Sequence, residues 1–217
     1  MDIIENYLPV WEGFRVNFKS FFQLIFEKSF SFNEPKWINK KETSQILVVD
    51  LDHTLIDTDL LFESSKGVLT HNPLLIFIYP LWFIKGKGFL KDQLKKRFEI
   101  DPNSLPYRQV ILDYIHQRKS LGHRVILATA SHQHYANHVA THLGIFDEVL
   151  ASDRSFNLSS HNKASLLIKK YGSGNFDYIG DHMRDIPVWE VSHLSIITNA
   201  SRRVIKKTSQ LNRLILD

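Results

Sequence analysis

The sequence predicts an α/β protein built on a Rossmann-like, doubly wound parallel sheet. Three observations lead to this prediction. Runs rich in Val, Ile and Leu recur from Ile46 onward and are mostly continuous rather than alternating with polar residues. Helical patterns follow these runs, and several of them stop at a glycine, such as Gly122 or Gly144. Apolar strands that alternate with helices are typical of a parallel sheet covered on both faces.

Residues 1–44 precede this pattern and predict an N-terminal helical extension and a linker. Apolar side chains recur three and four positions apart from Trp11 to Ile25, which is typical of one face of a helix. The polar stretch 33–44 contains a proline and three lysines and therefore favours a linker. We favour packing of the aromatic helix face against the protein over its insertion into a membrane.

The remaining elements alternate between strand and helix up to residue 198. The run ILVV at 46–49 predicts the first buried strand. Residues 59–106 carry a helical pattern interrupted by prolines and a glycine pair, which predicts several short helices. The elements expected after them are a helix from Tyr107 to Gly122, strands at 123–131, 148–152, 176–181 and 194–198, and helices at 133–143, 163–171 and 186–191. The basic segment after the last strand predicts a solvated tail.

The composition excludes several kinds of chemistry. For a chain of 217 residues, 43% hydrophobic and 23% charged residues argue against a disordered or fibrous protein. The absence of cysteine excludes disulfides, Cys-ligated metal centres and thiolate nucleophiles. The net charge of +4 permits anionic substrates or an acidic membrane surface without identifying either. No motif supports a nucleic-acid partner.

The N-terminus lacks a basic start followed by an apolar run, so no secretory signal is expected. The longest nearly apolar run, Leu74 to Ile84, covers roughly 16 Å as a helix, about half the hydrocarbon core of a bilayer. A chain without cysteine suits a reducing compartment. We therefore expect a cytoplasmic protein and leave peripheral membrane contact open; these features do not exclude export.

Polar side chains follow the predicted strands at the points where strands end. In parallel sheets of this kind, the reactive groups lie beyond the carboxyl ends of the strands, so we expect these side chains to gather at one rim. They are Asp50 and Asp52 after the first strand, Thr129 in the second, Lys163 at the start of a later helix, and Asp181 and Asp185 at and after the end of the strand 176–181.

Together these residue types can hydrolyse a phosphate ester. Asp50 can attack phosphorus to form an aspartyl-phosphate, while Asp52 protonates the leaving oxygen and later activates water. Thr129 is expected to donate a hydrogen bond to a phosphoryl oxygen, and Lys163 to stabilise negative charge in the transition state. Mg²⁺ prefers carboxylate oxygens and would offset the repulsion between the nucleophile and the phosphate. The predicted metal ligands are Asp50, Asp52, Asp181 and Asp185.

Four segments, in this order, resemble the motifs of haloacid dehalogenase-like (HAD) phosphatases: DLDHTL, LATAS, HNKASLL and GDHMRD. The likeness extends over residues 46 to about 199. It implies a Mg²⁺-dependent phosphatase, and its second aspartate favours phosphatases over true dehalogenases. His53 replaces the commoner Gly or Ser at a position that mainly contributes backbone. The roles implied are nucleophile for Asp50, acid/base for Asp52, motif-two hydroxyl for Thr129, motif-three lysine for Lys163 and metal pair for Asp181 and Asp185.

The same resemblance implies a division into domains. Residues 45–57 and 107–217 would form the HAD core, and residues 58–106 a helical cap of the C1 kind, which closes over the site and usually selects substrate. This segment is aromatic and basic; we favour a small cap core with a solvated basic face over a membrane-facing or amphiphile-binding surface.

Segments such as NPLLIFIYPLWFIKGKGFLKDQL are similar to HAD domains fused ahead of UbiA-type prenyltransferases. In those proteins a multi-helix membrane domain follows the HAD domain, whereas this sequence ends at Asp217 without one. The likeness therefore implies that the chain is either a fragment of such a protein or a free-standing relative. It also implies a polyprenyl-linked or similarly amphiphilic phosphate as a substrate.

The favoured function is hydrolysis of a phosphomonoester carried by a small molecule, a lipid or a protein. A first alternative is a protein phosphotyrosine phosphatase with an aspartate nucleophile, because an aromatic cap suits a phosphotyrosine ring. A second is a non-catalytic, membrane-recruited interaction module, against which the complete set of acids argues. The sequence does not determine the oligomeric state.

Three histidines on the predicted helix 133–143, namely His134, His138 and His142, lie at i, i+4 and i+8 and offer a metal face. The neighbouring stripe on that helix is apolar. We therefore favour a partly solvated border for these histidines over a metal site.

Overall fold

The computed structural model describes residues 43–216. The helical extension and nearly all of the linker predicted for residues 1–44 lie outside the described residues. The described residues form a six-stranded sheet in the order β3-β2-β1-β4-β5-β6, and every neighbouring pair is parallel. The strands are β1 (Ile46–Val49), β2 (Arg124–His132), β3 (Glu148–Ser152), β4 (Asp177–Gly180), β5 (Ser195–Ile197) and β6 (Arg213–Ile215). The predicted Rossmann-like, doubly wound sheet is confirmed.

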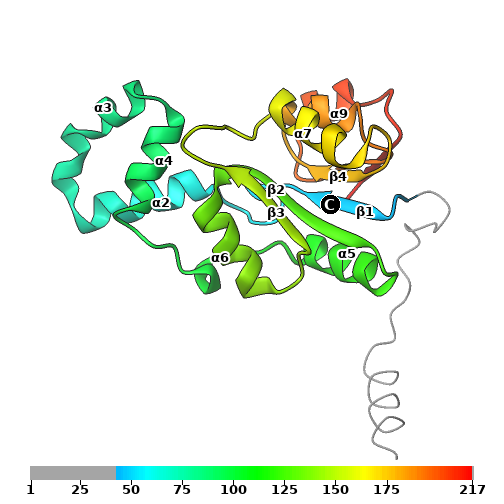
Figure 1. The fold of residues 1–217 in the computed structure, drawn as a ribbon, viewed down its shortest axis with the longest axis horizontal. Coiled ribbons are helices and arrows are strands. Elements are labelled where there is room, and N and C mark those ends of the chain that lie inside the picture. The colour runs from blue at the N-terminus through cyan, green and yellow to red at the C-terminus, as the bar shows by residue number, and fades with distance from the viewer. Residues whose placement is uncertain (1–42, 217) are drawn as a thin grey trace, which may run out of the picture. The chain divides into compact units, whose positions relative to one another are not determined.

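Helices cover both faces of this sheet. In Figure 1, α5 and α6 lie on one side of the strands, and α7 and α9 lie on the other. One buried cluster joins sheet residues such as Val48, Ile126 and Tyr178 to side chains of α7, α8 and α9. The bounds are α5 (Gln109–Ser120), α6 (Gln133–Leu143), α7 (His161–Tyr171), α8 (Ile186–Trp189) and α9 (Arg202–Lys207).

The C-terminal segment differs from the prediction. The strand expected at 194–198 is β5, but it is not the last, and the segment predicted as a solvated tail forms α9 and β6. Ser201 caps α9 by accepting a hydrogen bond from the Val204 amide, and the Leu216 amide bonds Ile197 to extend the sheet. The half-exposed β6 has only three residues and lacks the apolar run by which a buried strand is found in a sequence.

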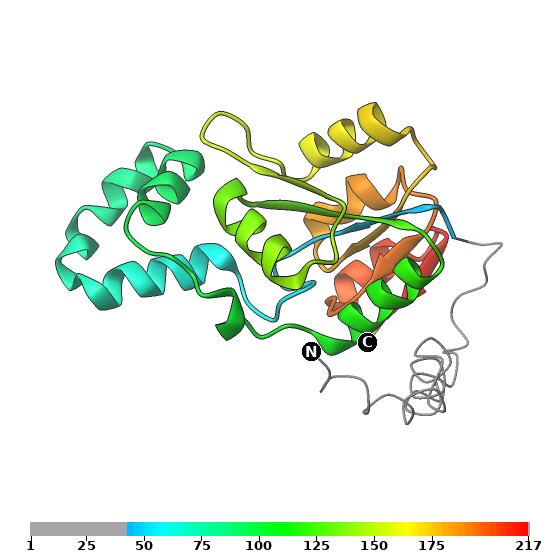
Figure 2. The same cartoon turned by 60° about the horizontal axis from the view of Figure 1, so that its bottom comes forward.

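Residues between β1 and α5 form a separate helical lobe. Figures 1 and 2 show it beyond one end of the strands. The lobe has its own apolar cluster around Val68, Trp82, Leu90 and Leu94. Its elements are α2 (Leu60–His71), η1 (Pro73–Phe77), α3 (Tyr79–Ile84), α4 (Lys87–Lys95) and η2 (Pro102–Ser104), the two η elements being 3₁₀ helices.

A buried ion pair holds the opposite end of the sheet, where β1 and β4 begin. Arg118 Nη1 lies 2.8 Å from Asp177 Oδ2, and both side chains are fully buried. Arg118 also donates to the Ser44 carbonyl oxygen at 2.6 Å and to His123 Nδ1 at 2.7 Å. Helix α5 is thereby tied to the start of the central strands.

Candidate active site

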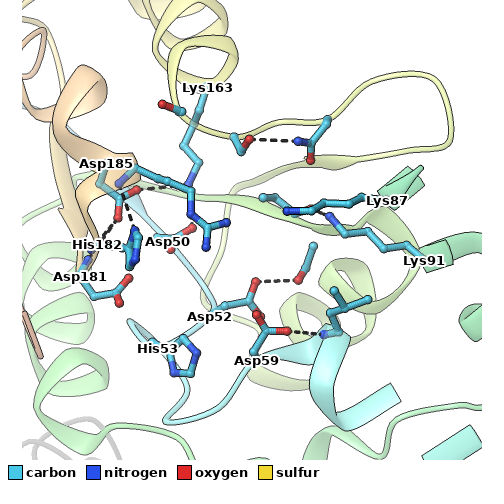
Figure 3. Close-up of a pocket in the computed structure, with 17 residues that line it drawn as sticks. Asp50, Asp52, His53, Asp59, Lys87, Lys91, Lys163, Asp181, His182 and Asp185 are labelled. Carbon is cyan, nitrogen blue, oxygen red and sulfur yellow. Dashed lines mark hydrogen bonds and ion pairs between the residues drawn. The ribbon is translucent and has the colours of Figure 1, made fainter. Parts of the chain in front are cut away.

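The central strand β1 delivers Asp50 to the rim where the sheet meets the lobe. The Asp50 amide bonds the Ile179 carbonyl oxygen at 3.0 Å, so the backbone is still held in the sheet at this residue. Its carboxylate is nearly buried, and Oδ1 accepts a hydrogen bond from Lys163 Nζ at 2.7 Å (Figure 3). The predicted nucleophile and the predicted lysine, 113 positions apart, are therefore in direct contact.

A tyrosine that the sequence analysis missed connects Lys163 to the predicted metal pair. Lys163 Nζ donates to Tyr178 Oη at 2.7 Å, and Tyr178 Oη donates to Asp185 Oδ1 at 2.6 Å. Burial, with Asp185 and Asp50 nearby, raises the pKa of Tyr178 well above its usual range, so the phenol keeps its proton. The hydroxyl of a tyrosine in a buried strand needs a hydrogen-bond partner. This requirement is the feature of the sequence by which Tyr178 could have been found.

The predicted metal pair, Asp181 and Asp185, lies beside Asp50. Ligand oxygens of Asp50, Asp181 and Asp185 lie within 4.8 Å of one another. Burial raises the pKa of Asp50 to about 8 against the lowering effect of Lys163, while burial and Asp185 raise that of Asp181 to about 6. Neighbouring buried carboxylates repel one another unless a proton or a cation lies between them. Hard oxygen donors gathered in this way fit a divalent ion such as Mg²⁺.

A larger residue would not fit at Gly180, the position before Asp181. A Cβ at Gly180 would lie 2.8 Å from Cγ of Asp185, closer than real side chains pack. Asp185 also accepts hydrogen bonds from the amides of Asp181 at 3.3 Å and His182 at 3.0 Å. Asp185 is the last residue of the 3₁₀ helix η3 (Met183–Asp185), and these hydrogen bonds hold its carboxylate against the end of β4.

Asp52 lines the same cavity as Asp50 but has different hydrogen-bond partners. Its Oδ1 accepts from the Leu60 amide at 2.9 Å, at the start of α2, and its Oδ2 from Ser131 Oγ at 2.6 Å. Asp52 was also predicted as a metal ligand, but it is not part of the three-carboxylate cluster. Burial and the neighbouring Asp59 raise the pKa of Asp52, which favours a proton donor.

The predicted motif-two hydroxyl lies behind Asp52. Thr129 is fully buried, and its Oγ1 donates to Asp52 Oδ2 at 3.3 Å and accepts from the Ser131 amide at 2.9 Å. Of the two hydroxyl residues at the end of β2, Ser131 lines the cavity, and the sequence analysis did not select it. Two hydroxyl residues two positions apart on one strand share a face, and only packing decides which one reaches the cavity.

The backbone is strained at two positions beside these acids. His53 has φ +58° and Ser160 has φ +51°, values that non-glycine residues adopt at a cost. A left-handed conformation at His53 accounts for the commoner glycine at this position. It turns the chain after Asp52 so that the His53 amide bonds the Thr58 carbonyl oxygen at 3.0 Å.

These side chains surround a cavity of about 290 Å³ between the sheet and the lobe (Figure 3). The lobe contributes Lys87 and Lys91 to the lining, and the core contributes the cations Lys163 and Arg184. Lys91 Nζ donates to the Ala130 carbonyl oxygen, so α4 contacts the end of β2. Apart from Leu61 and Ala130, the lining side chains are polar or charged: Asp50, Asp52, His53, Asp59, Lys87, Lys91, Ser131, Asn157, Ser159, Ser160, Lys163, Asp181, His182, Arg184 and Asp185.

We expect Mg²⁺ binding to strengthen as the pH rises. With the pKa of Asp181 about 6 and that of Asp50 about 8, protons compete with the ion throughout this range. The dissociation constant should fall by up to about ten-fold per pH unit between these values, measured by calorimetric titration at several pH values. Asp181→Asn should bind weakly throughout, and a wild-type affinity independent of pH would contradict this account.

Comparisons with known proteins agree with this geometry. A family model described as haloacid dehalogenase-like hydrolase matches residues 47–190. The uncharacterized protein y4nM of Sinorhizobium fredii strain NGR234 is 38% identical over 152 residues, which cover 70% of this chain. The match spans only 29% of that relative's length.

Three solved structures show the same fold at low sequence identity. A HAD family hydrolase from Salmonella enterica serovar Typhi has a TM-score of 0.59 at 13% identity, with 88% of this chain and 73% of that chain covered. A predicted phosphatase from Clostridium acetobutylicum has a TM-score of 0.60 at 16% identity, with 81% and 94% covered. A phosphoserine phosphatase in its apo form has 0.57 at 16% identity, with 80% and 93% covered.

Proposed function

The chain belongs to the haloacid dehalogenase-like hydrolase family, and from this premise we propose that it is a Mg²⁺-dependent phosphatase acting on a phosphomonoester. The observation that carries the proposal is the setting of Asp50. Its carboxylate is paired with Lys163 through Oδ1, borders a cavity of about 290 Å³ and lies beside two further acids. Asp52, with its raised pKa, borders the same cavity.

In the proposed reaction, an Asp50 oxygen attacks phosphorus, and the bond from phosphorus to the ester oxygen breaks. Asp52 gives its proton to the departing oxygen, which leaves as an alcohol, and Asp50 carries the phosphoryl group. Asp52, now a carboxylate, takes a proton from water, and the resulting hydroxide attacks the aspartyl-phosphate. Inorganic phosphate leaves, Asp50 is restored as a carboxylate, and Asp52 is restored as an acid.

The other residues position these groups. Lys163, held in the charged form by Asp50 and Asp185 in spite of its burial, orients Asp50 Oδ1. Ser131 and the Leu60 amide hold Asp52 at the border of the same cavity. We assign Asp50, Asp181 and Asp185 to Mg²⁺; the bound ion supplies positive charge against the repulsion between nucleophile and phosphate.

We further propose that residues 58–106 act as a cap of the C1 kind over the core formed by 45–57 and 107–217. Lys87 and Lys91 of α4 line the cavity together with the acids, so the lobe would select the substrate. Their charge, with that of Arg184, favours a substrate with a second anionic group. A polar lining of this extent supports a small phosphorylated molecule better than a bare lipid chain.

The test is phosphate release from p-nitrophenyl phosphate with Mg²⁺ and with EDTA. We expect turnover with Mg²⁺, loss with EDTA and recovery when Mg²⁺ is added back. A panel of phosphorylated small carboxylic acids, a phosphotyrosine peptide and a prenyl phosphate then separates the substrate classes. Folded protein that is silent on every substrate would overturn the phosphatase proposal and leave a non-catalytic module.

A second proposal concerns the tip of the lobe: in place of the solvated face favoured from the sequence, we assign it to the surface of an anionic membrane, because its apolar side chains are exposed. Large apolar side chains are exposed along η1 and α3, with Phe77 at 78% and Ile84 at 80%. Apart from Lys87 and Lys91, which line the cavity, the exposed cations of this lobe are Lys66, Lys85, Lys96 and Arg97, and such charges complement anionic lipid. No helix among the described residues is long and apolar enough to cross a membrane. The exposed set is Leu74, Ile76, Phe77, Ile78, Leu81, Phe83 and Ile84.

We expect the protein to co-sediment with phosphatidylserine-containing vesicles and only weakly with phosphatidylcholine vesicles. The double substitution Phe77→Ser and Ile84→Ser should abolish most of this binding, because it removes two of the most exposed apolar side chains. Phe156→Ser is the matched control, since Phe156 is also exposed but follows β3 in the core. Equal losses in both variants, or none in the first, would contradict the assignment.

A further inference from the structure

The described residues contain a second group of side chains that could hold a metal ion, none of which lines the cavity. Ligand atoms of Glu99, His134 and His138 lie within 4.8 Å of one another. His134 Nε2 lies 2.8 Å from both carboxylate oxygens of Glu99, and His138 Nδ1 lies 3.6 Å from Oε2. All three side chains are accessible to solvent, with exposed fractions of 26% for His134, 45% for His138 and 60% for Glu99.

The structure selects two of the three histidines on α6. His134 and His138 are one turn apart, with ring centroids separated by 4.2 Å. His142, one turn further, stacks instead on Tyr107, with centroids 5.9 Å apart and an interplanar angle of 21°. The sequence pattern alone offered three equivalent histidines and no carboxylate. The fold supplies Glu99, 35 positions before His134.

We propose that Glu99, His134 and His138 bind a divalent transition-metal ion, with Zn²⁺ as the best fit. Two imidazole nitrogens and one carboxylate oxygen are a ligand set that Zn²⁺ accepts, with a fourth position left for water. Imidazole nitrogen does not suit Mg²⁺, which prefers oxygen ligands. This site therefore differs in metal preference from the three carboxylates beside Asp50.

The ion would join two parts of the molecule. Glu99 lies in the connector that follows α4 and leads into η2, whereas both histidines are on a core helix. The same connector is already tied to α6, because Tyr135 Oη donates to the Phe98 carbonyl oxygen at 2.5 Å. A metal at Glu99 would fasten the segment by which the chain returns from the lobe to the core.

The test is titration of the tag-free full chain with Zn²⁺ and with Co²⁺ in saturating Mg²⁺, which keeps the acidic cluster occupied. We expect about one Zn²⁺ per chain by calorimetry, and visible d–d absorption bands with Co²⁺. His138→Ala and Glu99→Gln should each weaken binding by at least about ten-fold, the lower bound for disturbing a metal's surroundings. His142→Ala, on the same helix, is the control and should bind as wild type does.

Melting curves in EDTA show whether each variant is folded, and exposed Glu99 gives a substitution with little effect on packing. No binding by wild type, unchanged binding in both ligand variants, or equal loss in His142→Ala would overturn the proposal. The measured quantity is metal binding rather than turnover, so the result is independent of the phosphatase proposal.

Discussion

Replacing Asp50 with Asn is expected to reduce kcat for phosphate release by at least about four orders of magnitude, because an amide oxygen cannot take over as nucleophile. The fold should persist. Asn has the same size as Asp, and its amide oxygen can still accept the hydrogen bond from Lys163. Steady-state kinetics with Mg²⁺, beside thermal melting of the same preparation, measure both effects.

The matched control for that variant is Asp113→Asn. Asp113 is an exposed carboxylate on α5 that accepts a hydrogen bond from Gln109 at 2.8 Å, and it lines no part of the cavity. It should retain full activity. Retention of more than about one hundredth of wild-type kcat in Asp50→Asn would argue against an aspartyl-phosphate on this residue, since hydrolysis by water activated elsewhere would then suffice.

The largest effect on stability is expected from Arg118→Met, at about 3–5 kcal/mol in the free energy of unfolding. The substitution leaves Asp177 buried without its cation, and Asp177 Oδ1 already lacks a hydrogen-bond partner in the described structure. The Ser44 carbonyl oxygen and His123 also lose a donor. Urea unfolding followed by circular dichroism measures the change.

The loss caused by Arg118→Met should depend on pH. Burial raises the pKa of Asp177 above 3.8 even with Arg118 beside it, and removal of the guanidinium raises it further. An ionised, unpaired Asp177 destabilises the folded variant. This destabilisation is absent at a pH below the pKa of Asp177 in the unfolded chain, and it is complete at a pH above the pKa of Asp177 in the folded variant. The variant should approach wild-type stability toward acidic pH.

Adding Asp177→Asn to Arg118→Met should restore part of the stability at neutral pH, because no unpaired charge then remains buried. A single variant that loses less than about 1 kcal/mol would contradict the structural role of the pair. The same would follow from a loss that grows toward acidic pH.

Site residues could be predicted from the sequence where a chemically distinctive side chain follows directly after a predicted strand. Asp50 and Asp181 could be located because an apolar run ends at each of them. Ser131 and Tyr178 could not be selected, because a serine or tyrosine near a strand end has many ordinary roles. Their roles depend on which oxygen lies within hydrogen-bonding distance, and that is set by residues far along the chain.

The sequence by itself determined the parallel sheet, the helical lobe between β1 and α5 and the gathering of acids at one rim. These properties follow from local periodicity and from the rule that parallel strands end at the same edge. Only the tertiary structure decided the strand order, the place of β6, the link from Lys163 through Tyr178 to Asp185 and the approach of Glu99 to His134 and His138. Glu99 and His134 are 35 positions apart, and the packing of whole elements sets such distances.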